Sequence, residues 1–218
     1  MLDVEREQVA AACRRLAAER LLVGTAGNVS VRSGDRLAIT PTGAVLGTLT
    51  AEQVSMVDLD GRVVAGDFEP TSELDLHLGI VRRYDAGAVV HTHAPMATAL
   101  GCVLDELPCV HYQMLTFGGA VRVAPYATFG TPQLAENVLA ALEGRNAALM
   151  GNHGSVTHGR DLDAAVDHAL LLEWACTVYW RAAQLGTPRV LDAAQQGAVI
   201  EAALQRGYGS TRTLTEER

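Results

Sequence analysis

The amino-acid sequence predicts an α/β fold, a three-layer α/β/α sandwich around a mainly antiparallel or mixed central sheet. Segments with apolar residues at helical spacing alternate with short β-type runs over most of the 218 residues. Turn signals such as Ser33-Gly34-Asp35 and Asp60-Gly61 join neighbouring runs in the first third of the chain, which favours antiparallel hairpins there. The length is typical of one α/β domain, so we expect residues 1–218 to fold as a single unit.

The opening helix is predicted from Val9, Cys13 and Leu16, which lie three or four residues apart, with Gly24 as a stop signal. The same spacing predicts the later helices, one of which starts with the favourable pair Thr131-Pro132. We expect helices over residues 3–22, 72–84, 94–100, 131–142, 161–185 and 191–205.

Runs of β-branched and other apolar residues between turn signals predict the strands. These runs cover residues 29–31, 37–40, 55–59, 62–65, 88–92, 121–124, 147–150 and 155–156. The tail from about residue 207 is short and weakly patterned, so we expect it to be flexible.

The composition excludes several classes of enzyme. All 17 basic residues are arginine, and the chain contains no lysine. Schiff-base aldolases, pyridoxal-phosphate enzymes and Walker-A nucleotide binders each need a lysine amine, so none of these mechanisms is available. The formal net charge of -8 and the scattered arginines argue against nucleic acid as a partner.

The four cysteines, Cys13, Cys102, Cys109 and Cys176, form no Cys-x-x-Cys pair and lie within apolar patterns. This pattern is typical of buried free thiols in a reducing compartment. Charged residues interrupt the N-terminal stretch MLDVEREQVAAACRR, where a signal peptide would be apolar, and no run approaches the ~18 to 20 apolar residues of a membrane span. We therefore expect a cytoplasmic protein with no membrane partner.

His91 and His93 are the strongest candidates for metal ligands. They end a buried-strand run, and side chains at i and i+2 of a strand point to one face with their Cα atoms about 6.6 to 7 Å apart. Both imidazoles can then reach one ion, and neutral imidazole suits zinc. A lone histidine is more often a satisfied core residue, but this pair favours a metal site.

A catalytic zinc ion normally has three protein ligands and an open position, so a third ligand should exist. His153 is the best candidate because it also follows an apolar strand whose end becomes polar. The sequence pattern alone leaves this assignment open. The remaining histidines are expected to be surface or packing residues: His77, His111, His158 and His168.

Glu73, at the start of a predicted helix, could serve a metal site as a general acid or base. Its alternative role is a first-turn acid that interacts with the helix dipole or pairs with an arginine. Three loops with glycines and hydroxyls could hold a phosphate through backbone N–H groups without lysine, although each alone is more often an ordinary turn. These loops are residues 24–28, 40–43 and 71–72.

Five motifs, in this order, resemble the class II aldolase and adducin family. They are TAGNVS at 25–30, ITPTG at 39–43, PTSE at 70–73, VHTHA at 90–94 and NHG at 152–154. The match spans most of the chain. Within the family, APYATFGT at 124–131 and the segment 108–112 are most similar to the L-fuculose-1-phosphate aldolase subgroup.

The resemblance implies the class II aldolase fold and a zinc ion held by His91, His93 and His153. It also implies that Glu73 lies at the metal, both as a ligand and as the general acid/base. The implied reaction is the reversible cleavage of a ketose 1-phosphate, such as L-fuculose 1-phosphate, to dihydroxyacetone phosphate and an aldehyde. Zinc would act in it as a Lewis acid.

The resemblance further implies a small phosphorylated sugar as the substrate and a homotetramer with active sites at subunit interfaces. Tyr112 and Tyr208 would then act in a neighbour's site, with Tyr112 as proton partner of the aldehyde oxygen, and Phe129 would shape the aldehyde end of the pocket. The residues implied to hold the substrate phosphate are Gly27, Asn28, Thr42, Gly43, Thr71 and Ser72.

Three alternative functions share this resemblance. Sugar-phosphate 4-epimerases of the family carry Asp where Glu73 stands, which favours the aldolase. A methylthioribulose-1-phosphate dehydratase shares the metal histidines, and the residues do not exclude it. A non-catalytic, adducin-like scaffold is expected to lack the zinc ligands, whereas all three matching histidines are present here.

Overall fold

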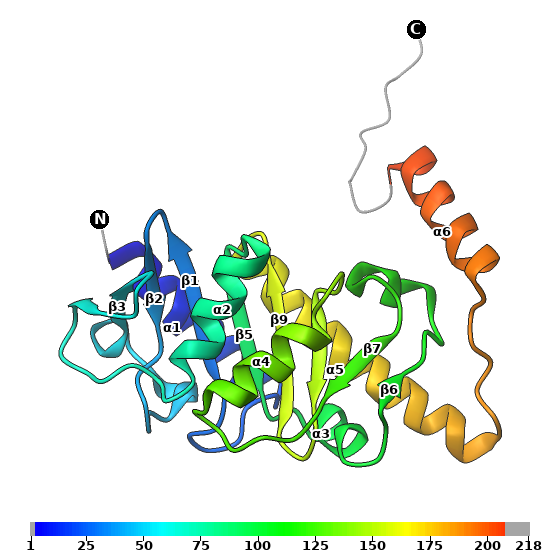
Figure 1. Cartoon of the computed structure of the whole chain (residues 1–218), viewed down its shortest axis with the longest axis horizontal. Helices are drawn as coiled ribbons and strands as arrows, with labels where there is room; N and C mark the ends of the chain where they lie inside the picture. The colour runs from blue at the N-terminus through cyan, green and yellow to red at the C-terminus, as the bar shows by residue number, and fades with distance from the viewer. Residues whose placement is uncertain (1–2, 208–218) are drawn as a thin grey trace, which may run out of the picture.

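The structure, a computed structural model, describes residues 3–207, and nine strands of that range form one sheet (Figure 1). The strands are β1 Asn28–Ser33, β2 Arg36–Ile39, β3 Ser55–Asp58, β4 Val63–Ala65, β5 Ala88–Thr92, β6 Glu106–Leu107, β7 Val121–Ala124, β8 Ala147–Met150 and β9 Gly154–Gly159. Their order is β4-β3-β2-β1-β5-β9-β8-β7-β6. Only β7 and β8 pair in parallel, so the sheet is mixed and mainly antiparallel, as the sequence predicts.

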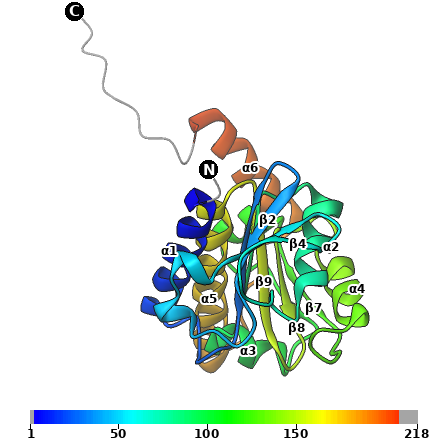
Figure 2. The ribbon, with the colours of Figure 1, turned by 90° about the vertical axis from the view of Figure 1, so that its left-hand side faces the viewer.

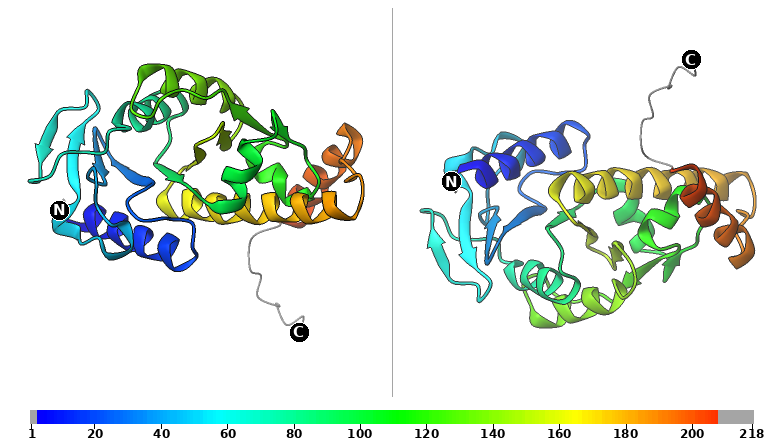
Figure 3. Two further views of the ribbon diagram at one scale, coloured as in Figure 1. Left: turned by 90° about the horizontal axis from the view of Figure 1, so that it is seen from below. Right: turned by 90° about the horizontal axis from the view of Figure 1, so that it is seen from above.

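Helices cover both faces of this sheet and confirm the predicted sandwich. The α-helices are α1 Asp3–Ala18, α2 Leu74–Tyr84, α3 Pro95–Gly101, α4 Pro132–Ala141, α5 Leu162–Leu185 and α6 Ala193–Arg206. Helices α2 and α4 lie on one face, and α1, α3 and α5 lie on the other (Figures 2 and 3). Short 3₁₀ turns complete the fold: η1 Leu46–Thr48, η2 Ala51–Gln53 and η3 Tyr112–Phe117.

The alternation of side chains along the central strands decides which face receives the polar residues. On β5, Ala88 and Val90 pack with the core under α1, α3 and α5, whereas Val89 packs with the core under α2 and α4. Successive strand residues point to opposite faces, so His91 lies on the same side as Val89. By the same rule, Asn28 on β1 lies opposite to Val29 and faces α2. The fold therefore brings polar strand residues to the side where α2 begins.

A half-buried carboxylate links α5 to the segment that follows His91 and His93. Glu173 of α5 accepts hydrogen bonds from the backbone N–H groups of Met96 and Ala97, at 2.9 and 2.8 Å. These groups belong to the first turn of α3, where backbone donors have no partner within the helix. The long helix thus fixes the start of α3, two residues after His93.

Differences from the sequence prediction occur mainly where the chain turns. The opening helix ends at Ala18 rather than residue 22, because Arg20 adopts a left-handed conformation with φ of 63°. Strand β9 extends to Gly159, beyond the predicted end at residue 156. The 3₁₀ turns and β6 were not predicted because they are too short to show a periodic pattern. Cys102 is exposed, which corrects the expectation that it is buried, because it lies at the C-terminal cap of α3.

Helix α6 stands apart from the sandwich, beyond the β6 end of the sheet and beside η3 (Figure 1). None of its described residues is buried, and Ile200 and Leu204 are exposed. Across residues 3–207, each helix is either too short or too polar to cross a membrane. Residues 208–218, including Tyr208 and most of the tail expected to be flexible, lie outside the described range.

The cap of α5 provides a test of the fold. The Asp161 carboxylate accepts a hydrogen bond from Ala164 N at 2.8 Å, so Asp161→Ala is expected to lower the free energy of unfolding by about 1 kcal/mol. This hydrogen bond is the main cause of the lowered pKa of Asp161. The contribution of the ionised cap should therefore persist at neutral pH and disappear as the pH falls through that lowered pKa. Urea unfolding across pH measures it, with Asp161→Asn as the control that keeps an acceptor; equal stability of the Ala variant and the parent would contradict the cap.

Candidate functional site

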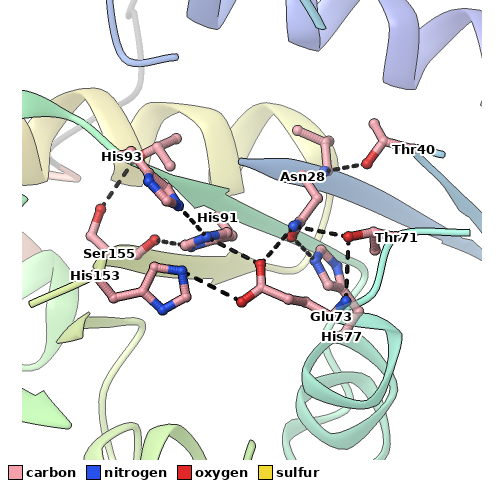
Figure 4. Close-up of polar contacts among 11 residues, drawn as sticks. Asn28, Thr40, Thr71, Glu73, His77, His91, His93, His153 and Ser155 are labelled. Atoms are coloured by element: carbon pink, nitrogen blue, oxygen red, sulfur yellow. Dashed lines mark hydrogen bonds and ion pairs between the residues drawn. The ribbon is translucent and has the colours of Figure 1, made fainter. Parts of the chain in front are cut away.

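Three histidines converge where the central strands β5 and β9 meet, at the C-terminal end of β5. His91 lies on β5, His93 follows that strand, and His153 lies in the turn between β8 and β9 (Figure 4). The potential ligand atoms of the three imidazoles all lie within 4.8 Å of one another, and each pair of ring centroids is 4.9 Å apart. The pairing of β5 with β9 brings the turn to the His91–His93 segment.

Gly154 makes this approach possible. A Cβ atom at Gly154 would lie 2.4 Å from the backbone oxygen of Thr92 and 3.3 Å from ring atoms of both His91 and His93. Any larger residue would force β9 away from β5. The glycine of the Asn152-His153-Gly154 motif is therefore required by the close packing of backbone and imidazole.

A backbone hydrogen bond on the side away from the cluster fixes the orientation of the His91 ring. Its Nδ1–H donates to the backbone oxygen of Ser155 at 2.9 Å, because a carbonyl can only accept. The opposite nitrogen, Nε2, then presents a lone pair to the cluster and lies 3.0 Å from His93 Nε2. A second partner of this kind is typical of histidines that bind metals.

The other two rings are poor proton acceptors. Burial, reinforced by the neighbouring imidazoles, lowers the pKa of His93 to about 4. Burial also lowers the pKa of His153. Both rings are therefore neutral near neutral pH, which leaves nitrogen lone pairs free to bind a metal.

Glu73 completes the cluster from the start of α2. Its carboxylate is 7% exposed, with Oε2 lying 3.2 Å from His91 Nε2 and Oε1 lying 3.6 Å from His153 Nε2. Burial alone would raise the pKa of Glu73, but attraction to a proton on His91, the hydrogen bond from Asn28 and attraction to a proton on His153 outweigh it, so the pKa is lowered and the carboxylate is ionised. Within residues 3–207, Oε1 has no hydrogen-bond partner.

These donors fit a divalent metal ion. Imidazole lone pairs and a carboxylate face one another at about contact distance, and such groups repel unless a cation lies among them. Three histidines and one carboxylate are ligand types found at zinc sites. The buried Oε1 of Glu73 accepts no hydrogen bond from residues 3–207, which is a further sign that the protein alone does not satisfy this cluster.

Behind Glu73 lies a second buried polar group, which joins Asn28 and Thr71, both expected to hold the substrate phosphate, to His77 and Ser30, which the sequence analysis did not assign to the site. The side-chain NH₂ of Asn28 donates to Glu73 Oε2 at 2.8 Å and to Thr71 Oγ1 at 3.1 Å (Figure 4). Asn28 Oδ1 lies 2.5 Å from His77 Nε2, and His77 Nδ1 lies 2.7 Å from Ser30 Oγ. Burial lowers the pKa of His77 to about 3, so this ring is neutral. His77 was expected to be a surface or packing residue, but it belongs to a hydrogen-bonded network that ends at Glu73.

A pocket of 530 Å³ opens beside the cluster and contains every described residue that was predicted to bind phosphate. It borders Glu73, His93 and His153, whereas His91 is fully buried beneath them. No lysine or arginine is among the described residues that line it. The lining comprises Thr25, Ala26, Gly27, Asn28, Pro41, Thr42, Gly43, Thr71, Ser72, Glu73, His93, Tyr126, Ala127, Phe129, Asn152 and His153.

Tyr112 does not border this pocket. It lies on η3 and lines a separate groove of 570 Å³ together with residues of α6. The structure of one chain therefore separates Tyr112 from Glu73, while Tyr208 lies outside the described residues. Tyr126 and Asn152 also border the pocket; both lie within the motifs at 124–131 and 152–154, but neither was assigned a role from the sequence.

Comparison with known proteins gives a consistent result. The family model described as Class II Aldolase and Adducin N-terminal domain matches residues 7–180. A 5-methylthioribulose-1-phosphate/5-deoxyribulose-1-phosphate aldolase of Rhodospirillum rubrum is 42% identical over 87% of this chain and 86% of its own length. A 5-deoxy-D-ribulose 1-phosphate aldolase of Bacillus thuringiensis is 37% identical over 88% of this chain and 91% of its own.

Among solved structures, an L-fuculose 1-phosphate aldolase superposes with a TM-score of 0.87 at 33% identity, covering 91% of this chain and 95% of that one. The predicted class II aldolase fold is thereby confirmed. The similar proteins carry names that refer to fuculose and to 5-deoxyribulose phosphates, so the name of the fuculose subgroup does not by itself identify a substrate for this chain.

Loss of any one of the three imidazoles is expected to weaken zinc binding. Changing a residue that only supports a ligand typically lowers metal affinity by about 10- to 100-fold. The variants His91→Ala, His93→Ala and His153→Ala should each lose more than this, because each removes a ligand. Titration of chelator-treated protein with zinc measures the affinity. His111→Asn, which alters a histidine outside the cluster, should bind like the parent, and parental affinity in any of the three alanine variants would rule that residue out as a ligand.

Proposed function

Because the chain belongs to the class II aldolase and adducin family, we propose that it is a metal-dependent lyase that reversibly cleaves a ketose 1-phosphate to dihydroxyacetone phosphate and an aldehyde. The observation that carries the proposal is the convergence of three imidazoles and Glu73 beside a pocket lined by hydroxyls and glycines. An aldol reaction needs either a lysine iminium or a metal as its electrophile. Since the chain has no lysine, the metal is the available choice.

The metal would be held by His91, His93 and His153, with Glu73 at its side, and zinc is the ion that this donor set favours. When bound, it would supply Lewis-acid polarisation of the substrate oxygens. Within residues 3–207, the pocket lining offers no cationic side chain that could take over this task.

The substrate phosphate would be held without a charged partner. Gly27, Gly43 and Ser72 line the pocket, where their backbone N–H groups and the Ser72 hydroxyl would donate to the phosphate. Thr71 Oγ1 accepts hydrogen bonds from Asn28 Nδ2 and from the backbone N–H of Glu73, at 3.1 and 3.3 Å. Both lone pairs of this oxygen are thus occupied, which leaves the Thr71 hydroxyl proton to donate into the pocket.

Glu73 would exchange the proton at the carbon that becomes part of dihydroxyacetone phosphate. Its carboxylate is ionised and borders the pocket, so it can accept or return a proton there. The leaving aldehyde needs a second proton partner for its oxygen, and we assign this role to Tyr112. Since Tyr112 lies outside the pocket of its own chain, it would act from a neighbouring subunit.

Exposed apolar residues support the assembly that this arrangement needs. Trp174, Trp180 and Leu185 of α5 are exposed, as is Leu204 of α6, which is 79% exposed. We therefore propose a homotetramer with active sites at subunit interfaces, to which Tyr112 and Tyr208 of an adjacent subunit contribute. Exposed apolar side chains of this size are the kind that protein–protein contacts cover.

The aldehyde half of the substrate would lie against Phe129 and Tyr126, the two aromatic residues that border the pocket. We propose a 5-deoxypentulose 1-phosphate as the first substrate to test, since relatives named for 5-deoxyribulose 1-phosphate are 42% and 37% identical to this chain. L-Fuculose 1-phosphate is the second candidate, supported by the structural neighbour. An apolar wall discriminates weakly between aldehydes that differ by a methyl or hydroxyl group.

The reaction class is tested by product analysis. Zinc-loaded protein should convert at least one of 5-deoxyribulose, 5-methylthioribulose, fuculose and rhamnulose 1-phosphates to dihydroxyacetone phosphate and an aldehyde, and a chelator should abolish the conversion. Mass spectrometry and a coupled assay for dihydroxyacetone phosphate measure it. An epimeric product from ribulose 5-phosphate would identify an epimerase instead, and loss of water from methylthioribulose 1-phosphate would identify a dehydratase. Activity that survives the chelator would overturn the metal mechanism.

Glu73→Gln is expected to retain zinc but to lose about 10²- to 10⁴-fold in turnover, because the amide cannot exchange a proton. Proton exchange at dihydroxyacetone phosphate, followed by NMR in deuterated water, measures this loss separately from cleavage. Normal turnover with bound zinc would reject Glu73 as the acid/base.

The Glu73→Gln variant also tests whether each active site combines residues of two subunits. Glu73→Gln subunits mixed and reassembled with Tyr112→Phe subunits should recover activity, since some interfaces then combine an intact Glu73 with an intact Tyr112. Glu73→Gln mixed with His153→Ala should not recover, because those two residues belong to the same pocket of one chain.

A further inference from the structure

The donor and the acceptor of each hydrogen bond in the buried network behind Glu73, formed by Asn28, His77 and Ser30, follow from simple rules. A carboxylate only accepts, so the Asn28 atom 2.8 Å from Glu73 Oε2 must be the NH₂ group. Asn28 Oδ1 therefore faces His77 Nε2, which must carry a proton in order to donate. A neutral imidazole has one N–H only, so His77 Nδ1 accepts from the Ser30 hydroxyl at 2.7 Å.

The geometry points to His77 as a positioning residue for Glu73: it holds the Asn28 amide in the orientation that turns the NH₂ group toward the Glu73 carboxylate. This inference rests on the proposed function, in which Glu73 handles the proton. The His77 imidazole does not line the pocket, and its hydrogen bonds go to Asn28 and Ser30 rather than to a metal ligand, so it acts on the Glu73 carboxylate through Asn28.

The alternative orientation of Asn28 shows why a holding residue is needed. A side-chain amide can rotate by half a turn and exchange its oxygen for its nitrogen. In the rotated state, Asn28 Oδ1 would face the Glu73 carboxylate, and two acceptors would meet in a buried place. The N–H of His77 stabilises the productive state, because it has a hydrogen-bond partner only when Asn28 Oδ1 faces it.

The local structure keeps these four side chains in register. Asn28 and Ser30 are two residues apart on β1 and point to the same face of the sheet. Glu73 and His77 are four residues apart at the start of α2, hence one above the other on the same face of the helix. Ser30 and His77 are fully buried, and Asn28 is 4% exposed, so water does not compete for these bonds.

A role in positioning predicts a different ranking of variants from a role in packing. Gln at position 77 can place an amide N–H where His77 Nε2 stands, whereas Leu has a suitable volume but no donor. Positioning therefore predicts that His77→Gln is the more active variant, even where His77→Leu is the more stable. If His77 only fills space in the core, the two variants should rank in activity in the same order as they rank in stability.

The experiment compares His77→Leu and His77→Gln with the parent by zinc affinity of the chelator-treated protein, thermal unfolding and proton exchange at dihydroxyacetone phosphate. His77→Leu is expected to lose about 10- to 100-fold in exchange rate or zinc affinity, as is typical for outer-shell changes, and His77→Gln to restore most of it. The matched control is His158, a buried histidine whose Nε2–H donates to the backbone oxygen of Arg145 at 3.0 Å, outside the network behind Glu73. His158→Leu and His158→Gln should change stability without this ranking.

A spectroscopic measurement decides the inference even where a variant does not fold. In the parent protein with histidine labelled by ¹⁵N, long-range proton–nitrogen correlation should show His77 as the neutral Nε2–H form, both with zinc and after chelation. An Nδ1–H form would overturn the inference, as would equal losses in folded His77→Leu and His77→Gln. If no sugar phosphate is cleaved, the proposed function fails, whereas the ring form and the ranking of zinc affinities still decide the role of His77.

Discussion

The crowding of electron-pair donors around Glu73 is the constraint on which the rest of the site depends. Three imidazoles and a carboxylate share a small volume that is buried on the side of His91 and Glu73, and no cationic side chain lies among the described residues of the adjoining pocket. Such a group is electrostatically unfavourable by itself, so the surrounding structure must hold each donor in place until a cation offsets the repulsion. The Ser155 carbonyl, the backbone contact at Gly154 and the Asn28 amide perform this task from three sides.

These supports come from regular structure rather than from loops alone. The two-residue repeat of β1 and β5 and the four-residue repeat of α2 bring donors and acceptors to one side of the sheet. A carboxylate on α5 fixes the start of α3, which closely follows His93. A site built in this way has little freedom to rearrange, which suits a reaction in which the proton-handling group must stay near the substrate carbon.

The pocket proposed to receive the substrate differs from the metal cluster in its chemistry. The pocket wall includes glycines, hydroxyl side chains and two exposed aromatic rings, and its described residues include neither lysine nor arginine. Neutral donors bind phosphate through directed hydrogen bonds rather than through net charge, so they do not compete with the metal for the negative charge of Glu73. The exposed residues of α5 and α6 and the separation of Tyr112 from the pocket are both explained if a neighbouring subunit completes the site.

Local patterns in the chain suffice for the class of fold, for most element boundaries to within about two residues, and for singling out His91 and His93 as candidate ligands. Strands predicted over residues 88–92, 121–124 and 147–150 agree with the structure to the residue, since a continuous apolar run between turn signals is a local property. The pair His91 and His93 is local in the same sense. The absence of lysine, a matter of composition alone, excludes the iminium mechanism.

Which distant residues meet depends instead on how the helices and strands pack. His153 and Glu73 approach His91 because β5 pairs with β9 and because α2 begins beside the sheet, and neither contact is encoded in a short window of sequence. His77 illustrates the difference most clearly. Its spacing from Glu73 and the spacing of Asn28 from Ser30 are visible in the sequence, but each pair has meaning only when the helix packs on the strand. Hydrogen bonds between side chains depend on positions in space, and only packing fixes those positions.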